Sequence, residues 1–361
     1  DKRGGIYPLL RAFTTIVMRE LNIQTLIGDM FAGVPAAYAT FVGYDEVAHH
    51  SGVESEDAFD ALRKLDQQFA RLASVAKQAP RPYHLVFLSD HGQSAGATFK
   101  QRYDMTLEDL IRKLAKDTRV EGGADVHEDW KHVNVFLTEA IQSETKAVSA
   151  PLGQVLKKRT VDGGVALGPE AEAALDVAGE VEAIDVVEDE DSLPIVVLAS
   201  GNLGLVYSTR RDERASMEEI EEFYPGLLDG LVQHEGIGLA MVRSDEHGPV
   251  VLGAGGRYYL AEDRVEGANP LAAFGPRAAE HLRRTNSFPD APDILLNSFY
   301  RAETNEVAAF EELIGSHGGL GGYQTEPLLL FPSEWELASE NLVGAEAVYR
   351  QLKTWLDQLH N

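Results

Sequence analysis

The chain contains no cysteine, and this absence limits how it can be stabilised and how it can bind a metal. Without thiols, neither disulfide bonds nor thiolate-ligated metal sites can form, so any metal must be held by histidine and carboxylate side chains. The redox compartment cannot be read from the sequence for the same reason. Hydrophobic residues still make up 44% of the 361 residues, which is enough for a globular protein with a sizeable core.

Basic residues are also scarce. The chain has 32 Lys+Arg against 58 Asp+Glu, which gives a net charge of −26, and no long basic stretch offsets it. Such a surface repels the phosphate backbone of nucleic acids and anionic membrane faces, so we expect no nucleic-acid polymer as a partner. A small phosphate ester held through bound cations remains compatible, because a metal ion can outweigh the local charge of the protein.

Long hydrophobic runs are missing as well. No stretch approaches the roughly eighteen uninterrupted apolar residues of a membrane span, and no signal peptide is present. The chain begins with Asp1 rather than Met, which favours a fragment from which localisation signals have been removed. Localisation and oligomeric state are therefore not determined by the sequence.

The spacing of apolar residues predicts helices over 6–33, 55–77, 107–115, 217–233, 272–284, 307–314 and 344–359. Short apolar runs predict strands at 36–42, 83–88, 133–137, 193–198, 237–242, 294–298 and 327–331. The runs 36–42 and 83–88 flank the helix predicted over 55–77, so they form a parallel strand, helix, strand unit by default.

The middle of the chain differs in composition from both ends. Residues 157–192 are rich in Gly, Ala, Asp and Glu and predict a surface insertion with weak internal structure. Its acidic run Glu188-Asp189-Glu190-Asp191 lacks the regular spacing of a calcium loop, which favours a solvated face over a calcium or partner site. The glycines of Gly253-Ala254-Gly255-Gly256 are followed by a strand pattern, which favours a hairpin turn over a phosphate-binding loop.

Three short polar stretches carry the candidate ligands. They are Tyr44-Asp45-Glu46-Val47-Ala48-His49-His50-Ser51-Gly52, Ser89-Asp90-His91-Gly92 and Gly315-Ser316-His317-Gly318-Gly319. The first two follow predicted strands, and ligands collect at the carboxyl ends of strands in open α/β sheets. We therefore expect these stretches to converge on one site.

Each stretch also has a purely structural interpretation. Chance alone gives roughly one Asp-x-x-x-His spacing in such a chain, and Asp45 and His49 could simply share one face of a helix. Asp90 and His91 are the stronger signal, because a purely structural strand gains nothing from two ionisable groups at its end. The glycines around His317 could serve only a turn. The side chain of His50 should diverge from that of His49 and is expected to contact either a metal ligand or the substrate.

Together, Asp45, His49, Asp90, His91 and His317 form a carboxylate–imidazole set that suits Zn²⁺ or Mn²⁺. Two such ions a few ångströms apart can clamp both the attacking and the leaving oxygen of a phosphoryl transfer. The order D-x-x-x-H, S-D-H-G at a strand end, and S-H-G-G before the last strand resembles the alkaline phosphatase superfamily. The resemblance is to its type I phosphodiesterase/nucleotide pyrophosphatase branch, over about residues 36–331.

This resemblance implies a fold and a ligand set. The fold is an α/β three-layer core with a mostly parallel sheet, incomplete at the N-terminus, and an inserted smaller α+β subdomain. In this division, 1–92 is the first part of the core, 93–290 the insertion and small subdomain, and 291–361 the last part of the core. By the same resemblance, Asp45, His49 and His317 hold one divalent ion and Asp90 and His91 the other, with Zn²⁺ favoured over Mn²⁺.

The family also uses an aspartate from the first strand and a Thr or Ser nucleophile at the following helix start, and neither is found in this chain. Thr14, Thr15 and Thr25 lie in helical patterns without a strand-end aspartate beside them, so the nucleophile is expected upstream of Asp1. The chain resembles the C-terminal part of bacterial members with membrane segments upstream. Any membrane contact would then come only through segments absent from this chain.

These observations predict a metal-dependent phosphohydrolase, with a phosphodiesterase favoured over a monoesterase, acting on a small phosphate ester. Residues 1–361 alone are expected to turn over poorly. Two alternatives stay open. The protein could be a sulfatase or phosphomutase-type member of the same superfamily, or a non-catalytic binding module whose acidic surface serves a partner.

Overall fold

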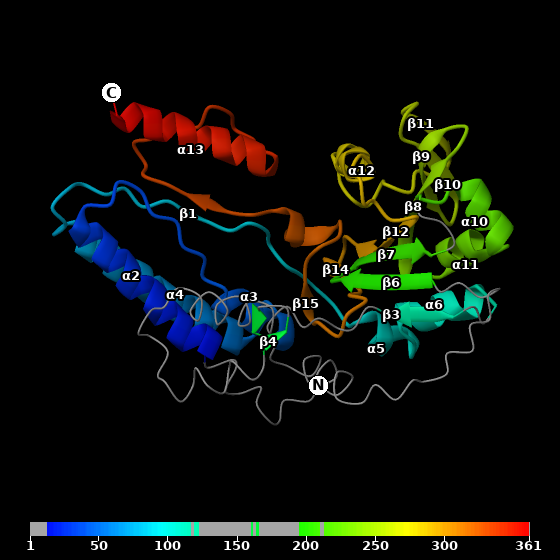
Figure 1. The fold of residues 1–361 in the computed structure, drawn as a ribbon, viewed down its shortest axis with the longest axis horizontal. Helices are drawn as coiled ribbons and strands as arrows, with labels where there is room; N and C mark the ends of the chain where they lie inside the picture. The colour runs from blue at the N-terminus through cyan, green and yellow to red at the C-terminus, as the bar shows by residue number, and fades with distance from the viewer. Residues whose placement is uncertain are drawn as a thin grey trace. The chain divides into compact units, whose positions relative to one another are not determined.

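The structure is a computed structural model that describes residues 13–116, 119–122, 160–161, 164–165, 195–209 and 213–360. The described chain is a mixed α/β protein that divides into two compact units (Figure 1). The first unit comprises 1–96, 300–307 and 313–361, and the second comprises 97–299 and 308–312. The strand predicted at 133–137, the acidic run and most of the predicted insertion lie outside the described residues. The predicted division of the chain into two parts of the core, 1–92 and 291–361, and an insertion with a small subdomain, 93–290, stays a prediction.

The second unit is built on an eight-stranded sheet with the order β11-β10-β9-β8-β12-β7-β6-β3. Its strands are β3 (Val120–Gly122), β6 (Ile195–Ser200), β7 (Leu203–Ser208), β8 (Ile237–Ser244), β9 (Gly248–Gly253), β10 (Gly256–Tyr259), β11 (Arg264–Gly267) and β12 (Ile294–Ser298). The neighbours β3 and β6 are parallel, and the other neighbouring pairs of this sheet are antiparallel. A separate two-stranded ladder joins β4 (Thr160–Val161) to β5 (Gly164–Val165).

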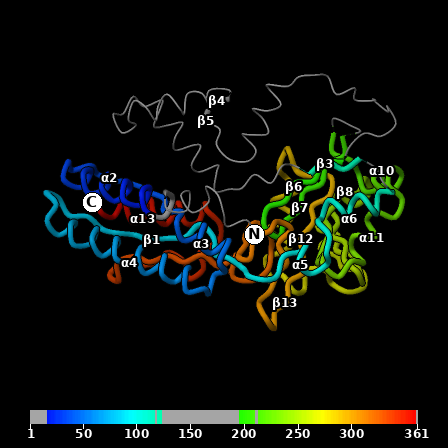
Figure 2. The backbone as a smooth tube through the Cα atoms, turned by 90° about the horizontal axis from the view of Figure 1, so that it is seen from below, coloured from blue at the N-terminus to red at the C-terminus, as the bar shows by residue number. Residues whose placement is uncertain are grey.

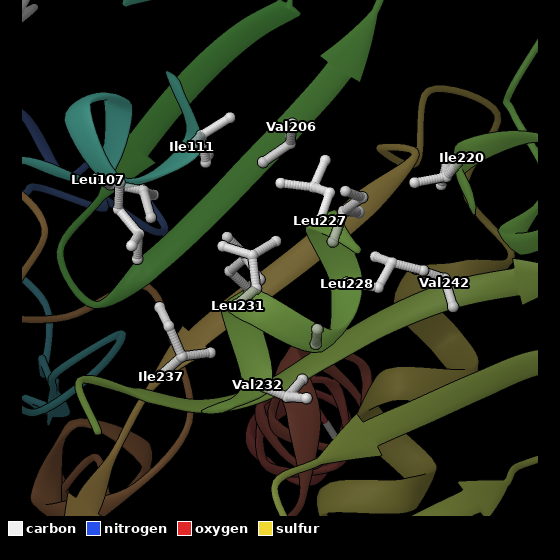
Figure 3. Packing of buried hydrophobic residues seen from close by; sticks show 14 of the residues in the cluster. Leu107, Ile111, Val206, Ile220, Leu227, Leu228, Leu231, Val232, Ile237 and Val242 are labelled. Carbon is white, nitrogen blue, oxygen red and sulfur yellow. The ribbon is translucent and has the colours of Figure 1, made fainter. Parts of the chain in front are cut away.

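The helices of the second unit are α5 (Phe99–Tyr103), α6 (Leu107–Leu114), α10 (Met217–Phe223), α11 (Leu227–Gln233) and α12 (Ala278–Asn286). The buried face of α11 carries Leu227, Leu228, Leu231 and Val232, which gather between the helix and the strands beside it (Figure 3). The single helix predicted over 217–233 is wrong, because Pro225 and the left-handed Gly226 (φ 83°) separate α10 from α11. The predicted hairpin is confirmed by the antiparallel pairing of β9 with β10.

The first unit is mostly helical in its N-terminal part. It contains η1 (Phe13–Met18), α2 (Arg19–Ala32), α3 (Gly43–Ser51), α4 (Glu56–Ala76), η2 (Gly322–Thr325) and α13 (Gly344–His360). Helices α2 and α4 lie side by side through Ile23, Met30 and Leu72 (Figure 2). Helix α3 is fastened to α4 through Val47, Ala48 and Ala58, so it has a fixed position in this unit. No helix among the described residues is long and apolar enough to cross a membrane.

Short strands connect the distant parts of the first unit. They are β1 (Phe87–Leu88), β2 (Ser94–Ala95), β13 (Tyr300–Arg301), β14 (Glu306–Val307), β15 (Gly315–Ser316) and β16 (Leu329–Leu330). Strand β15 pairs antiparallel with β2, placing Gly315 opposite Ala95 and Ser316 opposite Ser94. This pairing brings the residue after β15, His317, beside the loop that precedes β2.

The parallel strand, helix, strand unit expected near the N-terminus is not formed by the described residues. Residues 36–42 are in no strand, and Tyr38 is 81% exposed. Within 83–88 only β1 is a strand, and its partner β16 is antiparallel. A strand needs hydrogen-bonding neighbours, and an apolar run cannot show whether such neighbours exist. The mostly parallel sheet is therefore not observed, and the sheet of the second unit is mostly antiparallel.

The helix predicted over 307–314 is also wrong. Residues 308–312 belong to the second unit, where the Phe99 amide donates to the Ala309 carbonyl and the Phe310 amide to the Gly201 carbonyl. These long-range bonds use backbone groups that a helix would use internally. The apolar spacing of this segment reflects burial against neighbouring chain rather than a helical face.

Asp293, just before β12, ties three segments of the second unit together. Its carboxylate accepts the amide of Ser208 at 2.6 Å, at the end of β7, and the amide of Ala215 at 2.6 Å, just before α10. The residue is buried, and burial raises the pKa of its carboxyl group, although these two bonds act in the opposite direction.

We predict that Asp293→Ala lowers the free energy of unfolding of the second unit by about 2–4 kcal/mol, because two backbone donors lose their acceptor. Hydrogen exchange of the β8 and β12 amides measures this change. The matched control is Asp290→Ala at an exposed position nearby, which should change stability by less than about 0.5 kcal/mol. Equal effects of the two substitutions would contradict the assignment.

Candidate metal centre

The first candidate stretch forms helix α3, rather than a loop after a strand. Asp45 and His49 lie one helical turn apart and face each other, with His49 Nε2 at 3.1 Å from Asp45 Oδ2. Acidic residues occupy the first turn of α3 and histidines the last turn, which suits the helix dipole. Asp45 and His49 therefore do share one face of a helix, as the structural interpretation of this spacing proposed. The same helix face brings their side chains into contact.

The ring of His49 is held from behind by a backbone carbonyl. Its Nδ1 lies 2.7 Å from the Gly315 oxygen, and this oxygen only accepts, so Nδ1 carries the proton. His91 makes a similar contact, with Nδ1 at 3.0 Å from the Gly92 oxygen. A neutral imidazole protonated at Nδ1 offers its lone pair at Nε2. This tautomer, fixed by a bond at the other nitrogen, is typical of metal-binding histidines. In His49 the Nε2 nitrogen faces Asp45 Oδ2 at 3.1 Å and donates to it, because an ionised carboxylate only accepts, so a cation bound there would take the place of that proton.

Asp45, His91 and His317 each offer one ligand atom, and these atoms lie within 4.8 Å of one another. The Nε2 of His317 is 3.7 Å from Asp45 Oδ2, and its ring stacks on that of His91 with centroids 3.7 Å apart. Ligand atoms around a tetrahedral ion with bonds of about 2.0–2.1 Å lie about 3.4 Å apart. The distances from Asp45 Oδ2 to the Nε2 atoms of His49 and His317 lie close to that value, so these residues are compatible with a bound divalent cation.

The predicted ligands are therefore only partly brought together. His49 contacts Asp45 but lies outside the group of three, and His91 belongs to it. Asp90 also lies outside the group: its carboxylate is 80% exposed, accepts the adjacent His91 amide, and stands 3.6 Å from His91 Nε2. The assignment of these five residues to two ions stays a prediction.

The surroundings of Asp45 keep its carboxylate negatively charged, as binding a cation requires. Burial alone would raise its pKa, but the rings of His317 and His49 facing it outweigh this effect and hold the pKa well below its usual range. The side chain is still 31% exposed, so solvent reaches the site. Asp45 is therefore ionised at neutral pH and can be reached from outside.

The comparisons with known proteins agree with the motifs. Residues 33–203 match the family model of Type I phosphodiesterase / nucleotide pyrophosphatase. The match covers slightly less than half of the chain. The family lies within the alkaline phosphatase superfamily, so the resemblance deduced from the motifs is confirmed. No curated protein and no solved structure matches the chain.

The matched family is one of phosphoric ester hydrolases, which supports a hydrolase. The matched range contains Asp45, His49, Asp90 and His91. His317 lies beyond it, and the structure brings that residue to the family motifs through the pairing of β15 with β2.

Two residues of this centre were not singled out in the sequence. Gln93 donates its side-chain amide to Asp45, and its position directly after Ser89-Asp90-His91-Gly92 was the available signal. Gly315 was noted only for its flexible backbone, yet its carbonyl orients His49. His50, expected to contact a metal ligand or the substrate, lies in the buried part of α3, with its Nε2 at 3.8 Å from Glu46 Oε1.

Gly315 also has no space for a side chain. A Cβ atom there would lie 2.4 Å from Gln93 Oε1 and 2.6 Å from the Ala48 carbonyl oxygen. The Ala48 atom belongs to the backbone of α3, so it cannot move without displacing the helix that carries Asp45 and His49. The glycine therefore permits the close approach of β15 to α3.

We predict that Gly315→Ala destabilises the first unit by about 1–3 kcal/mol, the usual range for an overpacked site. Thermal unfolding followed by circular dichroism measures this change. Gly28→Ala is the matched control, because nothing lies within 4 Å of a Cβ at Gly28 and its backbone is helical. That substitution should be neutral or stabilising by about 0.5–1 kcal/mol, and a Gly315→Ala variant as stable as Gly28→Ala would refute the steric argument.

Proposed function

We propose that the protein is a metal-dependent phosphodiesterase that acts on a small phosphate ester by two-metal-assisted phosphoryl transfer. The observation that carries this proposal is the convergence of Asp45, His91 and His317 from three distant stretches of a chain that matches the type I phosphodiesterase family model. The family match supports the reaction class, and the donor set supports the metal dependence.

One ion is assigned to Asp45, His49 and His317, and the second to Asp90 and His91, with Zn²⁺ favoured over Mn²⁺ because the donors are mainly imidazoles. The fixed tautomers of His49 and His91 support their roles as ligands. Asp90 is highly exposed, so its carboxylate can turn toward His91 at little cost. The stacking of the His91 ring on the His317 ring supports a short distance between the two proposed ligand sets.

When bound, the ions would neutralise charge on the phosphoryl oxygens and lower the pKa of the attacking hydroxyl or water. The residues of the chain supply the rest. Asp45 stays ionised at neutral pH, Gly315 and Gly92 hold the protons on the two Nδ1 atoms, and α3 fixes Asp45 and His49 on one face. The donors are thus oriented before any ligand arrives, which lowers the cost of assembling the site.

The finer fold belongs to the same proposal. It divides the chain into 1–92 as the first part of a layered α/β core, 93–290 as the insertion and small subdomain, and 291–361 as the last part of the core. The change in composition over 157–192 supports an insertion in the middle of the chain. The net charge of −26 supports a small substrate over a nucleic-acid polymer.

We predict that the protein retains Zn²⁺ after dialysis and that His317→Ala and Asp45→Asn lose it, as measured by elemental analysis. Hydrolysis of bis(4-nitrophenyl) phosphate by the protein as its gene encodes it should fall with the metal. The loss should exceed the roughly tenfold to hundredfold typical of losing an outer hydrogen-bond partner. The control is His247→Ala, because His247 is bonded to Glu262 in the second unit and should affect neither quantity.

The outcomes separate the competing functions. A chain that binds no metal would favour the non-catalytic binding module. Faster cleavage of 4-nitrophenyl sulfate than of the phosphodiester would favour a sulfatase. Loss of metal in His247→Ala as well would show that the effect is not specific to the site.

The number of ions is a separate prediction. We expect two Zn²⁺ per chain by calorimetric titration and one in Asp90→Ala, because that variant removes a ligand of the second ion only. A single ion in the unmutated chain would replace the two-metal scheme with one ion at Asp45, His91 and His317. Two ions in Asp90→Ala would remove Asp90 from the ligand set.

A further inference from the structure

We infer that Gln93 is a positioning residue for the metal centre, which fixes the Asp45 carboxylate so that one oxygen is reserved for the cation. This inference rests on the proposed function. Gln93 follows the Asp90-His91 pair directly and precedes β2, and its side chain reaches helix α3. It connects two of the three stretches that converge on the site.

The contacts of the Gln93 amide are specific to Asp45. Its Nε2 donates to the Asp45 main-chain oxygen at 3.2 Å and forms a short hydrogen bond to Asp45 Oδ1. Both of these atoms only accept, so the nitrogen of the carboxamide, and not its oxygen, must face Asp45. The orientation of the amide therefore follows from its partners.

The hydrogen bond from Gln93 gives the two oxygens of the Asp45 carboxylate different partners. Oδ1 is occupied by Gln93, whereas Oδ2 faces His49 Nε2 at 3.1 Å and His317 Nε2 at 3.7 Å. Rotation of the carboxylate about its own axis would break the Gln93 bond. Gln93 therefore holds Asp45 in the position that presents a single oxygen to a cation, and favours one bond to the ion over two.

The oxygen of the Gln93 carboxamide is placed where it lowers the stability of the protein. Gln93 Oε1 is buried and has no hydrogen-bond partner within the described part of the chain. It packs where a side chain on Gly315 would otherwise lie, 2.4 Å from the position of a Cβ. A buried acceptor without a partner costs free energy. Packing alone would be served equally well by an apolar side chain of the same length, so the Nε2 bonds to Asp45 are the distinctive contribution of glutamine.

The test uses Gln93→Met, which keeps the length and volume of the side chain and removes its donor. The probe is Zn²⁺ alone, titrated against the metal-free protein in competition with a chromogenic chelator. We expect the affinity of the ion held by Asp45 to fall by about tenfold to hundredfold, the usual effect of losing a partner of a metal ligand. Gln93→Glu should weaken binding further, because a carboxylate would face two acceptors.

Gln351→Met is the matched control. Gln351 is also buried in the first unit, where its carboxamide accepts from the Ala338 amide at 2.7 Å and donates to the Glu336 carbonyl at 3.3 Å. It should lose thermal stability without losing metal affinity. Unchanged Zn²⁺ affinity in Gln93→Met, or an equal loss in Gln351→Met, would overturn the inference, because the effect would then be absent or merely structural.

A second measurement needs no metal. In the metal-free protein, unfolding free energies of Gln93→Met, Asp45→Ala and the double variant should show coupling, since the two residues share a bond. Additive effects would show that the contact does not exist and would overturn the inference. Coupling in a protein that binds no Zn²⁺ would leave the contact intact, reject the proposed function, and reject the positioning role with it.

Discussion

The candidate centre depends on the close approach of β15 to helix α3. At this contact the carbonyl of Gly315 accepts the Nδ1 proton of His49, and the missing side chain of Gly315 leaves room for the α3 backbone and for Gln93. His317 is far from both α3 and β2 in the sequence. The antiparallel pairing of β15 with β2 brings it to the site, across more than two hundred residues of sequence. The hydrogen bond between His49 and Gly315, and the lack of a side chain at Gly315, thus allow the three polar stretches to lie close together.

The two compact units have different physical foundations. The second unit has a continuous apolar core beneath a broad, mostly antiparallel sheet, and its central strand β12 is buried along its whole length. The first unit has smaller apolar clusters around α2, α3 and α4, and its strands are short. All five predicted metal ligands belong to the first unit. Two of these ligands, His49 and His91, are oriented by hydrogen bonds to backbone carbonyls.

The electrostatics of the centre agree with the composition of the chain. A net charge of −26 discourages polyanions, and imidazoles together with one ionised carboxylate form a set that a divalent cation can complete. A cation there would reverse the local sign of the potential and allow a phosphate ester to approach. The charge of the whole surface and the chemistry of the site thus favour the same class of small substrate.

Local patterns in the sequence determined the helices at 56–76 and 344–360, the hairpin of β9 and β10, the resemblance to the type I phosphodiesterase family, and the residue types of the candidate metal centre. Those features depend on apolar spacing, turn residues and short motifs, which the chain carries locally. Only the tertiary structure decided that Asp45 and His49 lie on a helix, that 308–312 is buried without becoming a helix, and that Gln93 holds Asp45. The reason is physical: strand partners, backbone acceptors for imidazole protons and room for a side chain come from residues far away in the sequence. Such contacts do not change the periodic pattern of apolar residues in the segment that takes part in them, so this pattern cannot predict them.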